Sequence, residues 1–557
     1  MKYLLLSILA ISFFSVTAIG QDKAYLSEDL QGIAFLKSMD DVQAEGVESP
    51  YALKTSYEGL FLKNVQPPNL LAFSEIFSSS LGQKVTLEDI EKIIGDVVLF
   101  YRENGQPVVN VFVPPQGVKH DIIQVVVIEA TLGEIRIEGN EFFATEKIAS
   151  LFRSVPGETL DSAVVQDDVT LLNKNPYRTI EMVYEEGKEK GTTDVVLTVD
   201  DKKPMKYTLA FEDSGNALTE DERVNLGWNW GNAFNRGDVI NYGLSADPHG
   251  RFLKAHSVSY STNFPWGHDL SLNGSFAKNG ADFPDPSLKI DGLSWGGGIN
   301  YSMPLPEISS VEGYVQNLVL GYAFSRSNNS LAFGQVQISN TKSDTSEFSL
   351  SYSGSLPDKL GMTIVGASLF YSPGGMTSHN SKADLAASGA NNNQYERILF
   401  NVNRITMLPK NFIWNVGTQF QFASTNLPGG GKFGMGGWMT LPGYDEREAN
   451  GDEGFLVMTD VTTPPIVVSK YFNQEWEDSL TLRAFFGYGN TSVKQFDSTT
   501  INPHITMMSV GPGLRYAVGE NLTFRFDYGW QLKDSGGSLL TRRPYNHRGH
   551  FSLGLSY

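Results

Sequence analysis

Apolar and polar residues alternate with a period of two along much of the chain. The segment NLTFRFDYGW, residues 521–530, places five large apolar side chains on one face and small or polar residues on the other. The same pattern recurs from about residue 205 onward, for example in HDLSLNGSF, NLVLGYAFSR, SEFSLSYSG and the terminal HFSLGLSY. Alternation of this kind predicts strands with one apolar face.

The residues opposite the apolar face indicate what that face contacts. Because they are mostly small or polar, two such sheets packed together would not form a shared dry core. The pattern therefore favours a closed, transmembrane antiparallel β-barrel with lipid outside and water inside, since a bilayer admits no open sheet edge. A β-rich extracellular or periplasmic binding protein is the alternative interpretation.

The length of this region sets the expected number of strands. Strands of bacterial outer-membrane barrels need about 9–11 residues and occur in even numbers. Residues 204–557 accommodate sixteen candidate strands, at about 22 residues for each strand with its connection. We therefore expect a sixteen-stranded barrel in this part of the chain.

The N-terminus predicts export. Residues 1–20 contain a positive Lys2, an apolar stretch and the small residues Ala18 and Gly20 ahead of Gln21. This is the pattern of a cleaved secretory signal peptide, and an ordinary core helix is the alternative. No later apolar run approaches the ~18–20 residues that a membrane-spanning helix needs.

Between these regions, residues 54–203 predict two soluble α+β modules. VTLEDIEKIIGDVVLFYREN has apolar residues at helical spacing, and Thr86 and Asp89 form a capping pair at its start. Strand-like runs flank it: YEGLFL before, PVVNVFVPP and DIIQVVVIEA after. The order β-α-α-β-β occurs twice, at 54–130 and 131–203. The acidic, weakly patterned segment 21–53 is either a linker or a partly helical arm.

Composition excludes several function classes. With 43 basic and 62 acidic residues, the net charge of −19 argues against a nucleic-acid partner. The chain has no cysteine, so it can form neither a disulfide framework nor a thiolate site. The 55 glycines suit strands and tight turns better than helices.

Motifs that would indicate catalysis, nucleotide binding or metal binding are weak in this sequence. GLSWG at 292–296 fits a nucleophile pattern that requires a strand-turn-helix context, yet it starts a glycine-rich barrel strand. GGGKFG fits Gly-x-Gly-x-x-Gly but has no following helix. His547 and His550 stand without a carboxylate cluster that would indicate zinc. We therefore expect no catalysis, no cofactor and no bound metal.

Several short motifs, in order along the chain, resemble the transporters of two-partner secretion, the haemolysin secretion/activation proteins, whose α+β modules are called POTRA domains. In the modules the matching segments are VPPQ, GEIRIEGN and LNKNPYR, which contain Pro114, Gln116, Gly139, Asn140, Asn173, Asn175, Pro176 and Arg178. In the barrel, Leu441, Pro442, Gly443 and Tyr444 fall at the family's Val-Arg-Gly-Tyr loop. Phe485, Gly487 and Gly489 fall at its Phe-x-Asp-x-Gly strand.

The resemblance implies a function without bond chemistry. POTRA domains in the periplasm would capture an unfolded exoprotein, which then passes through a barrel embedded in outer-membrane lipid and folds outside as a large β-helix. The identity of that partner is not implied. Two alternatives are an outer-membrane protein assembly factor, which usually carries more modules, and a passive pore.

Two positions depart from the family pattern together. In the family, an arginine in the loop and an aspartate on the wall are thought to pair inside the lumen, and here Pro442 and Gly487 occupy those positions. Losing both partners leaves no unpaired charge in the lumen. We expect that substituting Tyr444 impairs export and that restoring arginine at position 442 alone does not help.

The loop itself, residues 423–453, is long for a connection. We expect it to fold into the lumen as a plug, with its acidic residues contacting bases such as Arg483, Arg515 or Arg525; a solvated extracellular loop is the alternative. Tryptophans near predicted strand ends, namely Trp266, Trp438 and Trp530, suggest membrane-interface positions.

Overall fold

The computed structural model describes residues 25–557 except 190, 217–218, 282–284, 286, 307, 309–310, 312, 334–335, 391, 475, 495–503 and 536–544. The predicted signal peptide, residues 1–20, lies outside the described residues. No helix within the described ranges has both the length and the apolar character needed to cross a membrane. The chain divides into two compact units, which are described separately below.

The first module is a four-stranded sheet covered by two helices. Its strand order is β3-β2-β6-β5, where β2 spans Gly32–Leu36, β3 Leu60–Lys63, β5 Val109–Phe112 and β6 Ile122–Glu129. The helices are α1 (Leu70–Ser78) and α2 (Leu87–Glu103). Strands β1 (Tyr25–Ser27) and β4 (Val85–Thr86) pair separately, and the short helical turns η1 (Met39–Asp41) and η2 (Pro50–Leu53) lie between β2 and β3.

Aromatic side chains fill the core of this module. Phe35 of β2 meets Phe73 of α1 edge-on at a ring-centroid distance of 4.7 Å, and both are fully buried. The predicted capping pair is confirmed: the Thr86 hydroxyl accepts from Asp89 N–H, and the Asp89 carboxylate accepts from Thr86 N–H at 2.8 Å. The cap fixes where α2 begins and therefore how its apolar side faces the sheet.

The start of the first module differs from the sequence prediction. The prediction leaves residues 21–53 as a linker or a partly helical arm and makes the YEGLFL segment the first strand of the module. In the structure, β2 pairs in parallel with both β3 and β6, so GIAFL is a central strand and the predicted first strand lies at the sheet edge. All five residues of β2 are buried, and a short continuous apolar run of this kind has no period-two signal to reveal it.

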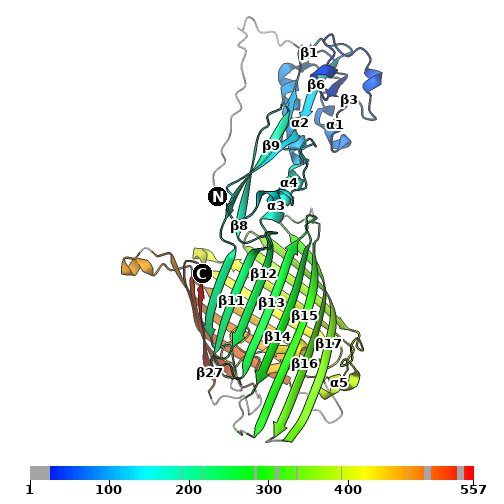
Figure 1. Ribbon diagram of the computed structural model, residues 1–557. Helices are drawn as coiled ribbons and strands as arrows, with labels where there is room; N and C mark the ends of the chain where they lie inside the picture. The colour runs from blue at the N-terminus through cyan, green and yellow to red at the C-terminus, as the bar shows by residue number, and fades with distance from the viewer. Residues whose placement is uncertain are drawn as a thin grey trace. The chain divides into compact units, whose positions relative to one another are not determined.

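The second module has the predicted order β-α-α-β-β. Its elements are β7 (Thr131–Glu138), α3 (Thr145–Ala149), α4 (Ser162–Leu172), β8 (Arg178–Glu186) and β9 (Thr192–Asp201). The strand order in the sheet is β7-β9-β8, with β7 and β9 parallel. Figure 1 shows both modules preceding the barrel in the chain.

The barrel confirms the predicted architecture, with sixteen strands in a closed ring. The strands are β10 (Met205–Glu212), β11 (Arg223–Ala233), β12 (Asp238–Ala246), β13 (Leu253–Asn263), β14 (Asp269–Gly280), β15 (Leu288–Pro304), β16 (Val315–Phe333), β17 (Val336–Asp358), β18 (Gly361–Ser372), β19 (Tyr395–Met407), β20 (Ile413–Ala423), β23 (Glu453–Thr462), β24 (Asp478–Ser492), β25 (His504–Val518), β26 (Leu522–Lys533) and β27 (His547–Ser556). Consecutive strands are antiparallel neighbours, and β27 pairs with β10 to close the ring.

The register separates the outer face of the barrel from its lumen. Directly paired residues share a face, so each face can be followed from strand to strand. On β27, Leu553 and Leu555 are 40% and 46% exposed and form part of the apolar outer face, whereas Arg548, His550 and Ser552 alternate with them and face inward. The segment 521–530 falls on β26, and its apolar face is the outer one.

The connections of the barrel differ at its two ends. The chain enters β10 from the second module, so the connections after β11, β13 and each further odd-numbered strand up to β19 lie at this near end, and those after β10, β12 and β20 lie at the far end. The connection between β18 and β19 contains α5 (Lys382–Ala387), and the short turns η3 (Pro409–Asn411), η4 (Gly429–Gly431) and η5 (Ser469–Phe472) lie in later connections. The GLSWG segment lies inside β15 and has the strand conformation expected for it.

Candidate functional site

The connection between β20 and β23, residues 424–452, folds into the barrel and is called here the lumen loop. A short hairpin of β21 (Phe433–Met435) and β22 (Ala449–Gly451) closes its stem. Within the loop, Leu441 and Tyr444 are fully buried and Asp445 is 3% exposed. The contacts that bury these residues come from the inner faces of β23 to β27.

An apolar cluster anchors the stem of the loop to the wall. Its loop members, Phe433, Met435, Leu441, Tyr444 and Ala449, pack against Leu456 of β23 and Met507 of β25. Removing apolar surface from water contributes about 25 cal/mol for each Å². A cluster of this kind, in a lumen otherwise lined by polar groups, holds the loop without depending on charge.

Glycines allow the loop and the wall to approach backbone to backbone. Gly443 has a φ of +106°, and a Cβ placed on it would lie 2.9 Å from the carbonyl oxygen of Gly529 on β26. Conversely, a Cβ on Gly529 would lie 2.2 Å from the carbonyl oxygen of Pro442. Any side chain at either glycine would therefore push the loop away from the wall.

Tyr444 occupies an irregularity between β25 and β26. The register of these strands shifts between Met508 and Ser509, which interrupts the main-chain ladder. The Tyr444 hydroxyl accepts from Met508 N–H at 3.0 Å and lies within hydrogen-bond distance of the carbonyl oxygens of Met508 and Lys533. The side chain thus supplies partners to main-chain groups at the bulge.

The predicted wall positions on β24 lie directly under the loop. A Cβ on Gly487 would lie 2.5 Å from Leu441 Cδ2, and one on Gly489 would lie 3.3 Å from Leu441 Cδ1. Phe485 is 2% exposed on the same inner face. The structure thus brings Leu441 onto Gly487 and Gly489 by apolar contact, while Pro442 and Gly443 lie against β26.

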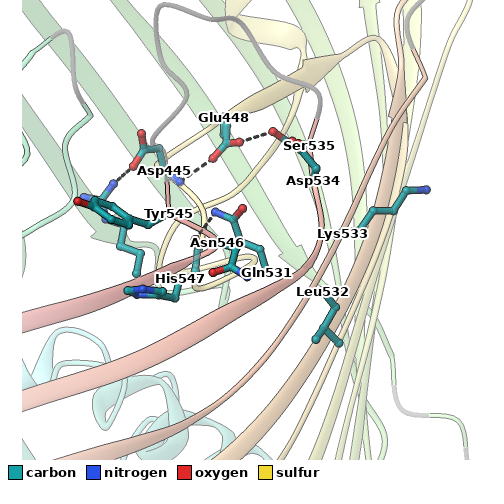
Figure 2. Close-up of a pocket in the computed structure, with 12 residues that line it drawn as sticks. Asp445, Glu448, Gln531, Leu532, Lys533, Asp534, Ser535, Tyr545, Asn546 and His547 are labelled. Carbon is teal, nitrogen blue, oxygen red and sulfur yellow. Dashed lines mark hydrogen bonds and ion pairs between the residues drawn. The ribbon is translucent and has the colours of Figure 1, made fainter.

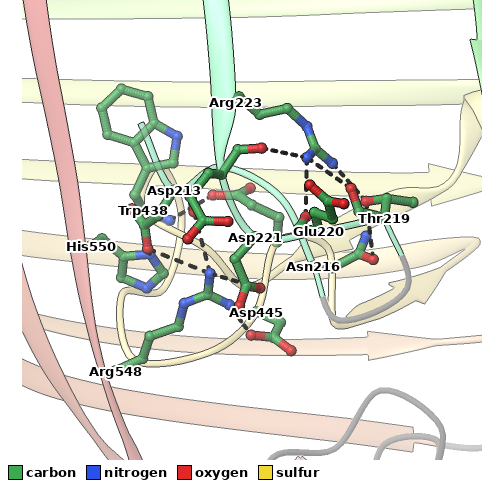
Figure 3. Close-up of polar contacts among 12 residues, drawn as sticks. Asp213, Asn216, Thr219, Glu220, Asp221, Arg223, Trp438, Asp445, Arg548 and His550 are labelled. Atoms are coloured by element: carbon green, nitrogen blue, oxygen red, sulfur yellow. Dashed lines mark hydrogen bonds and ion pairs between the residues drawn. The ribbon is translucent and has the colours of Figure 1, made fainter. Parts of the chain in front are cut away.

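The ionic contact between loop and wall is made by Arg548, a residue that the sequence analysis did not single out. Its guanidinium forms an ion pair with Asp445 of the loop, and its Nη2 lies 3.4 Å from Asp213 and 3.5 Å from Asp221 (Figure 3). Asp213 and Asp221 belong to the connection after β10. One side chain, 8% exposed, therefore joins the lumen loop, the last strand and the connection after the first strand.

His550 extends the same contact. Its Nε2 accepts from Gly443 N–H at 3.2 Å, and its Nδ1 lies 3.2 Å from the Asp213 carboxylate. A ring whose Nε2 accepts carries its proton on Nδ1, where it faces that carboxylate. His550 therefore positions the glycine turn of the loop.

A cavity of about 240 Å³ lies beside this contact. Gly443, Asp445 and Glu448 of the loop line it together with Gln531 and Ser535. Figure 2 shows Asp445, Glu448, Gln531 and Ser535 around it. Gln531 Nε2 donates to the Gly443 carbonyl at 2.6 Å, and the Ser535 hydroxyl donates to Glu448. These contacts add polar partners for the loop on the inner face and far end of β26.

The three lumen bases named from the sequence do not bind the acidic residues of the loop. Arg483, Arg515 and Arg525 converge on Asp527, at 3.8, 3.0 and 2.8 Å, and Asp527 is fully buried. That expectation was wrong because Asp527 shares the inner face with Arg525, two residues away, and so supplies a carboxylate from the wall itself.

Besides Asp527, Arg525 contacts Trp438 of the loop. Arg525 donates to the Trp438 carbonyl at 2.8 Å, and its guanidinium lies 4.2 Å from the centre of the Trp438 ring. Trp438 therefore lies inside the barrel and not at the membrane interface, which corrects the sequence prediction for this residue. Trp530 has its apolar face outward, with 44% exposed.

Comparison with known proteins identifies the family. A family model described as haemolysin secretion/activation protein ShlB/FhaC/HecB matches residues 191–516. The chain belongs to the haemolysin secretion/activation protein family. POTRA models match the modules: "Surface antigen variable number repeat" at 130–202 and "POTRA domain, ShlB-type" at 60–130.

One relative and two solved structures cover nearly the whole chain, and a second relative covers about half of it. It is 22% identical over 541 residues to the heme/hemopexin transporter protein HuxB of Haemophilus influenzae strain 86-028NP, with 90% of each chain covered. It is 22% identical over 260 residues to the outer membrane transporter CdiB of Dickeya dadantii, covering 46% of this chain and 45% of that one. The structure of CdiB from Escherichia coli has the same fold, with a TM-score of 0.72, 12% identity and coverage of 98% and 93%. The structure of CdiB from Acinetobacter baumannii also has this fold, with a TM-score of 0.63 and 15% identity. The match covers 97% of this chain and 91% of that one.

Membership in this family gives the barrel its orientation. The chain is an outer-membrane transporter of two-partner secretion, with its POTRA modules in the periplasm. The near end of the barrel is therefore periplasmic and the far end extracellular. The lumen loop enters the barrel from the extracellular end and lies against the inner wall.

In the first POTRA module, the VPPQ segment completes the sheet. Gln116 Nε2 donates to the Gln124 carbonyl at 2.6 Å, and its Oε1 accepts from Gln124 N–H at 2.7 Å. The same Nε2 lies 3.4 Å from the Pro114 carbonyl. The side-chain amide of Gln116 thus acts as an additional strand residue beside β6, beyond the end of β5.

In the second module, the LNKNPYR segment contacts the first periplasmic turn of the barrel, between β11 and β12. Asn175 Nδ2 donates to the carbonyls of Gly231 and Gly237 at 2.6 and 3.0 Å. Asn173 bonds the main chain of Ile180 in both directions, at 2.7 and 3.0 Å. Pro176 directly follows Asn175 in the chain.

Arg178 and the GEIRIEGN segment make contacts at the same end of the second module as Asn173 and Asn175. Arg178 Nε donates to the Leu172 carbonyl at 2.9 Å, and burial lowers the pKa of this guanidinium to about 10. Its guanidinium lies 4.9 Å from the centre of the Phe143 ring. Asn140 Nδ2 donates to the Phe143 carbonyl at 2.7 Å, and Gly139, with a φ of +87°, approaches the Val199 carbonyl too closely for a Cβ.

One group of side chains within the described residues has the spacing of metal ligands: Glu220, Asp247 and His249, on two extracellular connections. Arg251 pairs with Glu220 at 2.7 Å, and the Asp247 carboxylate accepts main-chain hydrogens of the 251–253 turn. These contacts explain why the three side chains lie close together: they form ion pairs and hydrogen bonds that cap a turn.

Proposed function

We propose that this transporter exports one large β-rich exoprotein, which its POTRA modules capture unfolded in the periplasm and which then passes through the barrel lumen. The observation that carries the proposal has two parts: the chain has the architecture of the family, and Arg548 fixes the lumen loop to one side of the barrel. An exported chain and a fixed loop can share a lumen only if the loop leaves part of the inner wall open.

Capture fits the outer strands of the two POTRA sheets, which offer main-chain groups beyond those already bridged at Phe61 and Thr131. The outer strands are β3 and β5 in the first sheet and β7 and β8 in the second. An extended polypeptide can add to such an edge as a further strand, with main-chain hydrogen bonds providing affinity with little dependence on sequence. This mode suits an unfolded client that must be released into the barrel.

The loop and the wall of this transporter have exchanged charges relative to the pair that the family resemblance implies. That pair places the cation on the loop and the carboxylate on the wall. Here the loop supplies Asp445 and the wall supplies Arg548. We propose that this reversed pair replaces the missing one and keeps Leu441 to Tyr444 in place.

The loop remains folded against its wall during transport in this account. Its release would expose the apolar cluster and break the buried contacts of Tyr444, Arg548 and His550. Each buried hydrogen-bonding group left without a partner costs about 1–3 kcal/mol. The chain contains no P-loop sequence that would couple nucleotide hydrolysis to such a release.

The test compares the proteins in the medium and on the surface of cells with and without the gene, and of cells complemented with the wild-type chain. Loss of one or two very large β-rich proteins, restored by complementation and with other barrels unchanged, is the expected result. A joint decrease of many outer-membrane proteins would instead support assembly. No change in any protein would contradict polypeptide export and favour a solute pore.

A further inference from the structure

Two sectors of the inner wall, on opposite sides of the ring, differ in charge: the inner face of β11–β17 is mostly neutral and that of β23–β27 is charged. On the inner face of β13, Ser257, Ser259 and Ser261 pair directly with Ser275, Asn273 and Ser271 of β14. Apart from three charged residues, the remaining inner positions of β11 to β17 are mostly serine, asparagine, glycine and alanine. Threonine, valine and other apolar residues occur singly among them. We call the inner face of β11–β17 the neutral wall.

Charged side chains on the described part of this wall are few and already paired. Asp269, at the periplasmic rim, binds Lys174 at 3.0 Å. Glu347 binds Arg397 at 3.1 Å. Arg223, at the extracellular rim, donates to the Thr219 carbonyl at 3.0 Å. Each of these groups already has a partner from this chain, and the described inner positions of β11 to β16 between the two rims carry no ionic side chain.

The opposite half has the reverse character. The inner faces of β23 to β27 carry Asp460, Arg483, Arg515, Arg525, Asp527, Arg548 and His550. The lumen loop covers this half, so that Asp527 is fully buried and His550 is 1% exposed. The side chains of Ser257 and Ser275, by contrast, are exposed to the lumen. The loop therefore blocks the charged half and leaves the neutral wall open.

Neighbouring side chains on the neutral wall hydrogen-bond to one another. Asn241 donates to the Ser259 hydroxyl at 3.1 Å, Asn317 donates to Ser302 at 2.7 Å, and Ser325 lies 2.7 Å from Thr345. Hydroxyl and amide groups paired in this way can exchange a neighbour for a passing main-chain N–H or C=O and then return to it.

We propose that the neutral wall is the surface along which the exported polypeptide moves in extended form. This inference rests on the proposed export function and specifies which part of the lumen carries it. Small side chains leave the widest bore on this side, and the lack of ionic groups prevents charged segments of the client from being held. Transient hydrogen bonds to the client main chain make the surface tolerant of sequence.

The chain has no native cysteine, so single cysteines report position without background. The client identified by the secretion comparison would carry one cysteine and a tightly folded C-terminal domain that arrests it in the barrel. Ser257→Cys and Ser275→Cys place thiols on the neutral wall, and Ser552→Cys places one on the inner face of β27 as the matched control. Labelling with a small maleimide establishes that all three thiols are accessible.

The proposal predicts disulfide cross-links to the arrested client at positions 257 and 275 that exceed those at 552 by at least tenfold. Equal cross-linking at all three positions, stronger cross-linking at 552, or none at any position would overturn it. If the wild-type chain secretes no exoprotein, the proposed function fails first, and that result is obtained before any cysteine is introduced.

A second pair of variants distinguishes an effect of charge on secretion from a failure of the barrel to fold. Ser257→Arg with Ser275→Arg should lower secretion at least tenfold, whereas Ser257→Asn with Ser275→Asn should retain most of it. Heat-modifiable gel mobility shows that each barrel is folded and inserted. Equal secretion by the two folded variants would contradict the requirement for a neutral wall.

Discussion

The guanidinium of Arg548 is shared among carboxylates from two connections of the barrel. Asp213 and Asp221 come from the connection after β10, and Asp445 comes from the lumen loop. Arginine supplies five N–H donors in a planar fork, so one side chain can bind several carboxylates at once. Loss of this cation would leave three acids close together in a confined space.

Arg548→Gln should therefore loosen the lumen loop. The expected result is a larger and more fluctuating single-channel conductance in planar bilayers, together with reduced secretion. Arg404→Gln is the matched control, since Arg404 also pairs with a carboxylate, Asp358, but on the outer face. Conductance traces that are the same for Arg548→Gln and wild type would show that this arginine does not hold the loop.

Exchanging the charges of Asp445 and Arg548 should not restore the contact between the loop and the wall. In a protein with both Asp445→Arg and Arg548→Asp, the new carboxylate at position 548 would face Asp213 and Asp221 and be repelled by them. We expect the double variant to conduct like Arg548→Gln. Wild-type conductance and secretion by the exchanged protein would mean that the pair with Asp445 is the sole important contact of Arg548.

Tyr444→Phe tests the hydrogen bonds at the bulge between β25 and β26. Removing the hydroxyl leaves the Met508 N–H without its partner, a loss of about 1–3 kcal/mol. Amide hydrogen exchange at Met508 should accelerate by about tenfold or more. Unchanged protection of Met508 would contradict the assigned role. Pro442→Arg, introduced alone, should improve neither exchange protection nor secretion, because Gly487 offers no carboxylate.

At the residue scale, motif resemblance located the loop tip but not the contact that holds it. Leu441 and Gly487 were selected independently and lie together in the structure. Arg548 could have been recognised, because it occupies an inward position of the last strand, directly opposite Gly529. Its carboxylate partners lie more than 100 residues away in the chain, so no local pattern indicates them.

At the scale of single elements, helices and alternating strands were predictable, and continuous apolar strands were not. The capping box at Thr86 and the period of α2 are local signals, as is the alternation along β26. Strand β2 carries no such signal, since it is buried on both faces. The position of Gln116 beside β6 depends on a tertiary pairing that the sequence does not display.

Strand β6 ends in a carboxyl group that couples the first module to pH. Burial raises the pKa of Glu129 above its ordinary value, opposed by Lys37 and by the Tyr101 hydroxyl. In the pH interval between the unfolded and the raised folded pKa, the folded state binds more protons than the unfolded state. The stability of the module therefore falls as pH rises from about 4.5 through that raised pKa.

Glu129→Gln should remove this pH dependence and stabilise the module at neutral pH. Urea unfolding of the intact protein in detergent, followed by circular dichroism at 222 nm, would report on the helices, of which α2 of the first module is the longest among the described residues. Glu75→Gln, on the exposed side of α1, is the control and should keep the wild-type pH profile. A Glu129→Gln profile parallel to the wild-type profile would show that this carboxyl group does not control the stability of the module.

At the scale of the whole barrel, sequence alternation and length were sufficient for the sixteen strands because lipid imposes one face on every strand. The division of the lumen into two halves was not predictable in the same way. It depends on which strands lie opposite the loop, and on the burial of charged residues such as Asp527 by that loop. The sequence shows the inner residues of each strand but not which of them remain open.

The central claim is that the lumen loop stays on the charged half while the client passes along the neutral wall. A disulfide between Leu441→Cys and Gly487→Cys would lock the loop. The two positions are in contact, since Leu441 Cδ2 lies 2.5 Å from the position of a Cβ at residue 487, and loss of free thiols on oxidation would establish that the bond has formed. Secretion would be measured before and after oxidation, with each single variant as control. The account predicts that oxidised and reduced proteins secrete the exoprotein at similar rates. Loss of secretion on oxidation, reversed by a reductant, would contradict it and show that the loop must leave the wall.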